Sequence, residues 1–283
     1  MKYIKFAVIS FLLGMFATSC DIIEEPYTKE GVFVWHGRKI LIYDFTGHKC
    51  GNCPRAHETI NSLINIYDEA VIPIAIHCTA FARVTGSDST QPYYYDFRTD
   101  IGDYLGGRMT EPGYYGELTL PIGLVNNLAK EKLLSHTAWP TEVAKFISSF
   151  PEYLIEIQPE YSNENDIVKA DIKVKTSVTN SRKIALTVFI IEEHIINWQT
   201  DYNKTPKDIP NYEHNHVLRA GFNGAWGEVI KNNTNVTVLG DEYTKSYSIT
   251  KGNDWKIQNC FIVAFVYDVD TYEVLQAEMI KVQ

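Results

Sequence analysis

The sequence predicts an α/β domain followed by an all-β sandwich. In the first half, short apolar runs of strand-forming residues alternate with an amphipathic helical pattern, which is typical of strands and helices packed in layers. Beyond Pro151 and Pro159, apolar and charged residues alternate instead, as in strands that have one exposed face. A chain of 283 residues is long enough for two such domains, each with its own core. We therefore expect one domain over 35–152 and a second over 153–283.

The elements expected in the first domain begin with a buried strand over 40–45, where apolar residues run almost without interruption. An amphipathic helix is expected next, because apolar side chains recur on one helical face. These side chains are Ala56, Ile60, Leu63, Ile64 and Tyr67. Further strands are expected over 71–76 and 121–125, and a last helix from Trp139 to about Phe150.

An insertion is expected over 79–118, because this segment is rich in Gly, Tyr and polar residues. It has room for one short helix over Phe97–Leu105. The tyrosine runs 93–95 and 114–115 are suited to contact a peptide or a glycan, or to pack the insertion onto the core. Before the insertion, Pro73 has no N–H to donate and must lie at a sheet edge or a bulge.

The second domain has the strand pattern of an immunoglobulin-like sandwich. Residues 167–175 alternate apolar and charged side chains, as in a strand with one exposed face. The other strand candidates lie between Asn, Gly and Asp turns, over 184–191, 247–250, 260–267 and 272–282. One long excursion, 197–235, interrupts the pattern. The expected fold is an antiparallel β-sandwich.

Composition excludes several classes of protein. The chain has 26 Lys and Arg against 35 Asp and Glu, a net charge of −9. A nucleic-acid-binding surface needs an excess of cations to release counterions, so a nucleic acid partner is not expected. Hydrophobic residues at 45% and charged residues at 22% are values of a globular protein, which argues against both general disorder and a multi-span membrane protein.

The first nineteen residues have the pattern of a secretory signal peptide. Lys2 and Lys5 precede an apolar stretch that is too short for a lasting membrane span. The following segment Phe16-Ala17-Thr18-Ser19-Cys20 resembles the lipobox of bacterial lipoproteins, which implies cleavage before Cys20 and acylation of that residue. Residues 20–34 are then a tether, and the acyl chains anchor the protein without spanning the bilayer.

A pair of cysteines in the first domain could carry redox chemistry. Cys50-Gly51-Asn52-Cys53 lies between the first strand and the helix, so Cys50 is expected at the helix N-terminus. The helix macrodipole, Lys49 and His48 would favour its thiolate there. The spacing allows Cys53 to resolve a mixed disulfide formed at Cys50. This hypothesis requires that Cys50 be accessible and close to the first turn of the helix. His57 and Glu58 are expected on the solvated face of that helix.

The residues from Asp44 to Cys53 (DFTGHKCGNC) resemble the redox motif of thioredoxin-like proteins. The resemblance implies that Asp44 is a buried acid that assists proton transfer to Cys53. Thr119-Leu120-Pro121-Ile122 is similar to the cis-proline loop of the same proteins. It implies a cis peptide bond between Leu120 and Pro121, with both residues facing the disulfide and binding the substrate backbone.

The whole chain also resembles the Omp28-related lipoproteins of the Bacteroidetes. Three features carry this resemblance. They are the lipobox, the segment 46–54 (TGHKCGNCP), and residues 214–219 (HNHVLR) followed by Gly221 and Trp226-Gly227. It implies a thioredoxin-like domain and a C-terminal β-domain on an outer-membrane lipoprotein, which would face the periplasm or the cell surface.

Each candidate residue also has a structural interpretation. The Cys50–Cys53 pair could be only a structural disulfide, which an oxidising compartment permits. Cys78 and Cys260 are expected as buried small side chains. His214 and His216 could share a metal, although the sequence supplies no obvious further ligand, and hydrogen bonds that organise a loop are the simpler role.

Two functions follow from these observations. In the first, Cys50, Cys53 and Asp44 exchange disulfides with an extracytoplasmic protein or peptide, without a cofactor. In the second, the protein is a surface binding or adhesion lipoprotein, and the cysteine pair only closes a loop.

Overall fold

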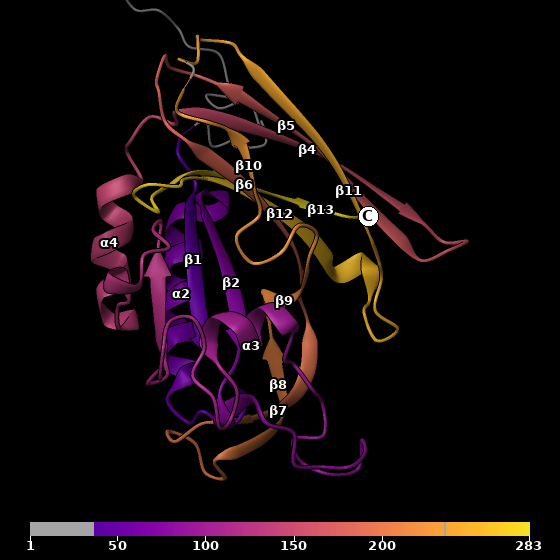
Figure 1. Cartoon of the computed structure of the whole chain (residues 1–283). Coiled ribbons are helices and arrows are strands. Elements are labelled where there is room, and N and C mark those ends of the chain that lie inside the picture. The colour runs from indigo at the N-terminus through magenta and orange to yellow at the C-terminus, as the bar shows by residue number, and fades with distance from the viewer. Residues whose placement is uncertain (1–36, 235) are drawn as a thin grey trace, which may run out of the picture. The chain divides into compact units, whose positions relative to one another are not determined.

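The structure is a computed structural model that describes residues 37–234 and 236–283 (Figure 1). The predicted signal peptide, the lipidation site Cys20 and the tether lie outside these residues. Among the residues that the structure describes, no helix has the length and apolar character needed to cross a membrane. These residues belong to one compact unit.

The first half contains the predicted strands and helices. The strands are β1 (Ile40–Thr46), β2 (Val71–His77) and β3 (Ile122–Val125), and the helices are α2 (Cys53–Tyr67), α3 (Asp100–Gly106) and α4 (Trp139–Phe146). Helix α4 carries a proline in its first turn, where the missing N–H is not needed. Short 3₁₀ turns lie at Asp68–Ala70, Ala80–Ala82, Lys130–Lys132, His136–Ala138 and, in the second half, Ile257–Asn259.

The second half consists of strands. They are β4 (Tyr153–Ser162), β5 (Ile167–Thr176), β6 (Ile184–Glu192), β7 (Ile195–Thr200), β8 (Asp208–His214), β9 (Val217–Gly221), β10 (Glu228–Lys231), β11 (Glu242–Thr250), β12 (Cys260–Asp268) and β13 (Val274–Lys281). The predicted strands over 167–175, 184–191 and 260–267 are confirmed. The predicted excursion over 197–235 is itself largely extended, because it holds most of the β7–β8 hairpin as well as β9 and β10.

Strands from both halves form one eight-stranded sheet, in the order β13-β12-β6-β9-β2-β1-β3, with β10 added to β6. Strand β1 runs parallel to β2 and antiparallel to β3. The two halves join where β9 lies parallel to β2, at the pair Ala75 and Val217, and the N–H of Ala75 donates to the carbonyl of His216 at 2.8 Å. Because this pairing is so short, Pro73 lies on a largely open edge of β2, as predicted. The architecture is therefore mixed α/β, built around a large sheet.

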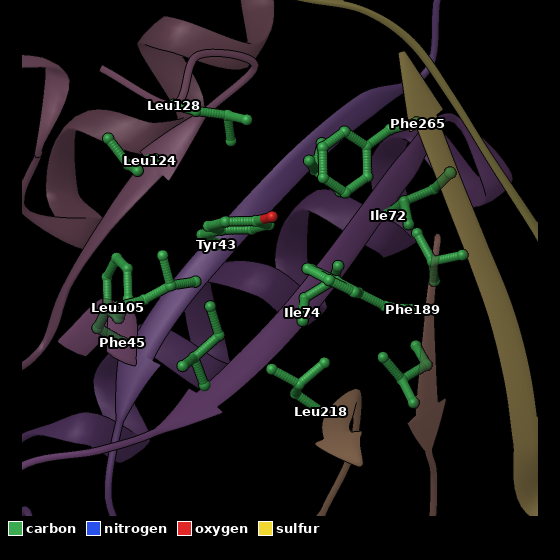
Figure 2. Packing of buried hydrophobic residues seen from close by; sticks show 14 of the residues in the cluster. Tyr43, Phe45, Ile72, Ile74, Leu105, Leu124, Leu128, Phe189, Leu218 and Phe265 are labelled. Atoms are coloured by element: carbon green, nitrogen blue, oxygen red, sulfur yellow. The ribbon is translucent and has the colours of Figure 1, made fainter. Parts of the chain in front are cut away.

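Two faces of this sheet bury different cores. Alternate residues of β1 point to opposite sides, so that Tyr43 enters one core and Ile42 packs beneath α2 and α4 in another. Figure 2 shows Tyr43 with Phe189 and Phe265 from the second half, and their ring centroids lie 6.4 and 6.1 Å from that of Tyr43. This shared apolar core fixes the end of β1, where the cysteine loop begins.

A separate core fills the space between β6, β12 and the three-stranded sheet β11-β5-β4. Strand β5 alternates strictly, with Val168, Ala170, Ile172 and Val174 all buried. The strand β6 contributes Val188 to this core and Phe189 to the shared core. This central sheet thus separates two apolar layers.

Candidate functional site

Cys50 and Cys53 form a disulfide just before and at the start of α2, and their Cα atoms are 5.4 Å apart. The helix begins at Cys53, and Pro54 occupies its first turn. Cys50 lies in the preceding turn, where its carbonyl accepts the N–H of Cys53 at 3.2 Å. The prediction that Cys50 occupies the helix N-terminus is therefore corrected: Cys53 holds that position, and Cys50 lies one turn earlier.

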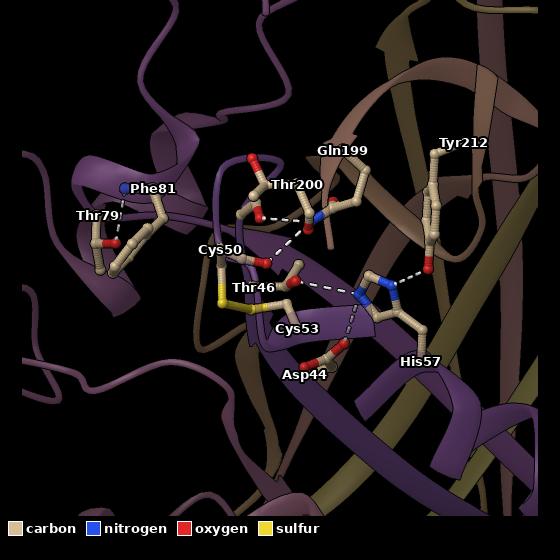
Figure 3. The surroundings of a disulfide bond; sticks show 11 residues. Asp44, Thr46, Cys50, Cys53, His57, Thr79, Phe81, Gln199, Thr200 and Tyr212 are labelled. Atoms are coloured by element: carbon tan, nitrogen blue, oxygen red, sulfur yellow. Dashed lines mark hydrogen bonds and ion pairs between the residues drawn. A yellow bond between two sulfur atoms is a disulfide. The ribbon is translucent and has the colours of Figure 1, made fainter. Parts of the chain in front are cut away.

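The disulfide is buried beneath the β7–β8 hairpin. Cys50 is 2% exposed and Cys53 is 0% exposed. Backbone hydrogen bonds join the hairpin to the cysteine loop: the N–H of Thr200 donates to the carbonyl of His48 at 2.8 Å, and the N–H of Tyr202 donates to that of Gly51 at 2.9 Å. The side chain of Gln199 donates to the carbonyl of Cys50 at 3.0 Å (Figure 3). The expected accessibility of Cys50 is absent in this closed arrangement.

Side chains also fix the hairpin in place. The guanidinium of Arg55 on α2 donates to both carboxyl oxygens of Asp201 at 3.0 and 2.9 Å. Tyr93, from the insertion, donates to Asp208 at 2.6 Å and shares a hydrogen bond of 2.7 Å with Thr200. This first tyrosine run thus packs the insertion against the hairpin. The sequence pattern predicted only an excursion over these residues, so the contact of the hairpin with the cysteine loop was not predicted.

The charges around Cys50 differ from those predicted. Burial lowers the pKa of His48 to about 4, so this side chain is neutral at neutral pH. Burial and the nearby guanidinium groups of Arg83 and Arg98 lower the pKa of Lys49 as well. The expected positive charge of His48 is therefore wrong, because the same packing that covers Cys50 removes water from the imidazole.

Asp44 is the buried acid that the sequence predicted. Its side chain lies on β1 and is 0% exposed, and burial raises its pKa to about 8. Neither of its carboxyl oxygens has a hydrogen-bond partner among the described residues. Asp44 is therefore predominantly protonated at neutral pH.

His57 is the residue at this site that sequence analysis missed. It was predicted on the solvated face of α2, but its Nε2 lies 3.5 Å from Oδ2 of Asp44 and 3.1 Å from Oγ1 of Thr46. Its Nδ1 lies 2.6 Å from the hydroxyl of Tyr212 on β8 (Figure 3). Burial lowers the pKa of His57 to about 4. A signal was present in the sequence, because residues four apart share a helix face and His57 follows Cys53 by four positions.

The Leu120–Pro121 peptide bond is cis, as predicted. Ile122, the next residue, pairs with Phe45 near the end of β1. The cis peptide bond therefore lies at the same end of the sheet as the cysteine loop. Leu120 belongs to the apolar core that also contains Cys50 and Cys53.

The two remaining histidine candidates have structural contacts. His214 is buried, and its Nε2 lies 3.2 Å from the carbonyl of Trp198. His216 lies between β8 and β9, with its Nδ1 2.6 Å from Oε1 of Glu193. Within residues 37–234 and 236–283, no group of His, Cys, Asp and Glu has the geometry to hold a metal ion. These contacts agree with the loop-organising role.

Cys78 and Cys260 are buried and free, as expected. Burial raises the pKa of the Cys78 thiol well above its ordinary value and that of Cys260 to about 12. Both are therefore thiols, not thiolates, at neutral pH, and neither adds a nucleophile to the site.

The fold and the site define a mixed α/β protein with a disulfide-closed CxxC loop ahead of a helix. The family model described as outer membrane protein Omp28 matches residues 108–283, which is more than half of the chain. The chain therefore belongs to the Omp28 family of outer membrane proteins, and this membership supports a location in the cell envelope. Comparison with curated proteins gives no significant match.

Solved structures give further similarities. The structure titled "HBP35 of Porphyromonas gingivalis" is 16% identical with a TM-score of 0.60, over 87% of this chain and 76% of that chain. At this identity the likeness concerns the fold alone. A domain of the outer membrane lipoprotein Omp28 from Porphyromonas gingivalis is 25% identical with a TM-score of 0.31, over 47% of this chain and 89% of that one.

Proposed function

We propose that the protein is an envelope lipoprotein whose Cys50–Cys53 pair exchanges disulfides with extracytoplasmic proteins. The observation that carries this proposal is the carboxyl of Asp44, which is fully buried without a hydrogen-bond partner among the described residues and lies next to the helix turn that holds Cys53 and His57. A structural disulfide has no need of such a group. Perturbed titratable groups beside a potential nucleophile are typical of functional sites.

The energetics support a chemical role for Asp44. A shift of its pKa from 3.8 to about 8 destabilises the folded state by about 4 kcal/mol at neutral pH, because the unfolded chain ionises there and the folded chain does not. A disulfide across a loop as short as Cys50–Cys53 stabilises by only about 2 kcal/mol through loop entropy. The acid thus costs more than the disulfide contributes, which favours a role in reaction.

The exchange would start from the disulfide. Because Cys50 is 2% exposed, the β7–β8 hairpin must first move away from the cysteine loop. A thiolate of the partner then attacks Sγ of Cys50, the bond between Cys50 and Cys53 breaks, and its electron pair passes to Sγ of Cys53. Asp44 gives its proton to this leaving sulfur. The partner's second thiolate then attacks the mixed disulfide and releases Cys50 as a thiolate. The partner is oxidised by two electrons to a disulfide, and the cysteine pair is reduced by two. Leu120 and Pro121 would hold the backbone of the partner.

We interpret the fold in the same terms. Strands β1, β2 and β3 with α2, α4 and the cis-proline loop support a thioredoxin-like unit over 35–152, with 79–118 as its insertion. The antiparallel strands over 153–283 support an immunoglobulin-like sandwich. In this interpretation β9 extends the sheet of the first unit. We place the protein among the Bacteroidetes lipoproteins, anchored through Cys20 after removal of residues 1–19. Replacement Cys20→Ala, followed by membrane fractionation, tests the anchor.

The exchange function is tested by trapping. Cys53→Ala leaves Cys50 as a free thiol, which can run the exchange in reverse by attacking a disulfide of a partner. The resulting mixed disulfide at Cys50 cannot be resolved without Cys53, so incubation with envelope extracts should accumulate adducts that a reductant releases. The matched control is Cys50→Ala, which should trap nothing. The absence of adducts, together with a wild-type disulfide that stays closed in strong reductant, would overturn the proposal.

A second candidate function is favoured by the 2% exposure of Cys50. In that case the protein is a surface binding or adhesion lipoprotein, and the disulfide only fixes the cysteine loop beneath the hairpin. Half-exposed aromatic side chains, Tyr104 and Tyr114, would then contribute contacts. The trapping experiment separates the two functions, because a structural disulfide gives no adduct.

A further inference from the structure

We propose that His57, oriented by Tyr212 of the β7–β8 hairpin, is a positioning residue that carries protons between the buried carboxyl of Asp44 and solvent. This inference rests on the proposed function and deepens it. Each turnover would leave Asp44 without its proton, and the acid must be reprotonated before the next one. The carboxyl has no exposed atom through which water could do this directly.

His57 lies between the buried carboxyl of Asp44 and solvent. The side chain of Asp44 is 0% exposed, whereas that of His57 is 17% exposed, and the two approach to 3.5 Å. The imidazole therefore contacts both the buried acid and the outside. A proton can pass from solvent to the ring and from Nε2 to the carboxylate, without any movement of β1 or α2.

Tyr212 sets the orientation of the ring. Its hydroxyl lies 2.6 Å from Nδ1, so Nε2 points toward Thr46 and Asp44. When the tyrosine hydroxyl donates to Nδ1, Nε2 carries the ring proton and can give it to the carboxylate, and a proton taken up by the ring from solvent replaces it. Burial holds the pKa of Tyr212 well above its ordinary value, so the phenol stays protonated at neutral pH.

A small polar cavity lies beside the same groups. Its volume is about 40 Å³, and its lining includes Asp44, His57, His77, Tyr212 and His214. A space of this size is sufficient for a water molecule, which needs polar partners such as these. The cavity thus offers a polar surrounding in which the protonated imidazole could form briefly.

The groups facing His57 keep it neutral between turnovers. Burial lowers the pKa of His57 most, and the proximity of His216 and of the Arg55 guanidinium lowers it further. From the other packed elements, β1 presents Asp44, β2 presents His77, and β8 presents Tyr212, Glu213 and His214. A neutral imidazole at neutral pH can accept a proton and pass it on, as a relay requires.

The test compares the pH dependence of disulfide reduction in the full chain. The rate of reduction by dithiothreitol is measured from about pH 6 to 9, and the pKa of Asp44 is read from its carboxyl carbon by NMR. The variants are His57→Phe, His57→Gln and Tyr212→Phe, with Glu58→Gln as the matched control on the exposed face. His57→Gln keeps a polar side chain and remains informative where His57→Phe fails to fold.

We expect the wild-type rate to follow an ionisation at the pKa of Asp44. Both His57 variants should slow reduction at neutral pH by about tenfold and shift or remove this ionisation, with a smaller effect in Tyr212→Phe. The control should match the wild type. Unchanged pH profiles in folded His57→Gln would overturn the inference. Failure of the exchange function is distinguishable, because it appears as an absence of trapped adducts while these profiles still depend on His57.

Discussion

The two ends of the molecule bury different kinds of side chain. In the three-stranded sheet β11-β5-β4, the inward residues of β5 are apolar, and charged residues such as Lys169 and Lys173 stay outside, each paired with a glutamate of β4. At the disulfide end, Asp44, His48 and His214 are buried together. A side chain that ionises in water costs free energy when it is buried. The three-stranded sheet therefore buries only side chains that stabilise the fold, whereas the disulfide end also buries side chains whose burial lowers stability.

The largest effect is expected in the core that joins the two halves. Phe189 lies on β6 and packs against Tyr43 of β1. Phe189→Ala should destabilise the protein by about 3–5 kcal/mol, because it leaves a cavity between strands of both halves. Chemical denaturation measures this, with exposed Val238→Ala as the control, for which little change is expected. Separate unfolding of the two halves in the variant would show that this core couples them. An unchanged free energy of unfolding would contradict the prediction.

Removal of the buried acid should act in the opposite direction. The pKa of Asp44 is raised to about 8, so the folded state holds a proton that the unfolded state releases above its ordinary pKa of 3.8. The stability of the wild type should therefore fall as pH rises from about 4 to 8. Asp44→Asn should remove this loss and stabilise by about 2–4 kcal/mol at pH 8, with little effect near pH 4. Equal stability of the variant and wild type at both pH values would contradict the raised pKa.

His48 should contribute a pH dependence of the other sign. Burial lowers its pKa from 6.5 to about 4, so between these pH values the imidazole is protonated in the unfolded chain and neutral in the folded chain. Its contribution to stability is intact above pH 6.5 and is lost as pH falls toward 4, by about 3 kcal/mol. His48→Gln should flatten this acid limb in thermal unfolding curves. An acid limb as steep in His48→Gln as in the wild type would contradict this prediction.

The sequence predicted elements best where burial alternates or runs continuously. Strand β5 was predicted to within one residue because every second side chain is apolar, and β1 and β2 because their runs are almost wholly apolar. The continuous sheet could not be predicted, because β9 meets β2 at a single pair between residues far apart in the chain. No local pattern encodes such a contact.

The candidate site was predicted where a short local motif carries the signal. The two cysteines follow from their spacing and their place before a helix, whereas Asp44 and Pro121 follow from the resemblance to thioredoxin-like motifs. His57 was missed because a polar residue on a helix is ordinarily exposed, and its burial depends on Tyr212, 155 residues away. The cover over Cys50 was missed for the same reason: the β7–β8 hairpin arrives from the second half of the chain.

The smallest expected effect is on the barrier to reduction of the disulfide, and it tests whether the β7–β8 hairpin limits access to Cys50. Gly51 lies against Tyr202 so closely that an added Cβ would come within 2.4 Å of the tyrosine ring. Gly51→Ala should therefore push the hairpin away from the cysteine loop. We expect the disulfide to be reduced by thioredoxin-sized reductants about tenfold faster, which corresponds to a barrier lower by about 1.4 kcal/mol.

Asn52→Ala is the matched control, because Asn52 is the exposed next residue and makes no side-chain capping bond to α2. It should leave the rate unchanged. Arg55→Ala tests the same point independently, since it removes the ion pair that binds Asp201 of the hairpin to α2. If both hairpin variants react at the wild-type rate, the hairpin does not limit access to Cys50. The burial of the disulfide would then reflect the cysteine loop itself, and the contrast between the two ends would rest on Asp44 and its histidines alone.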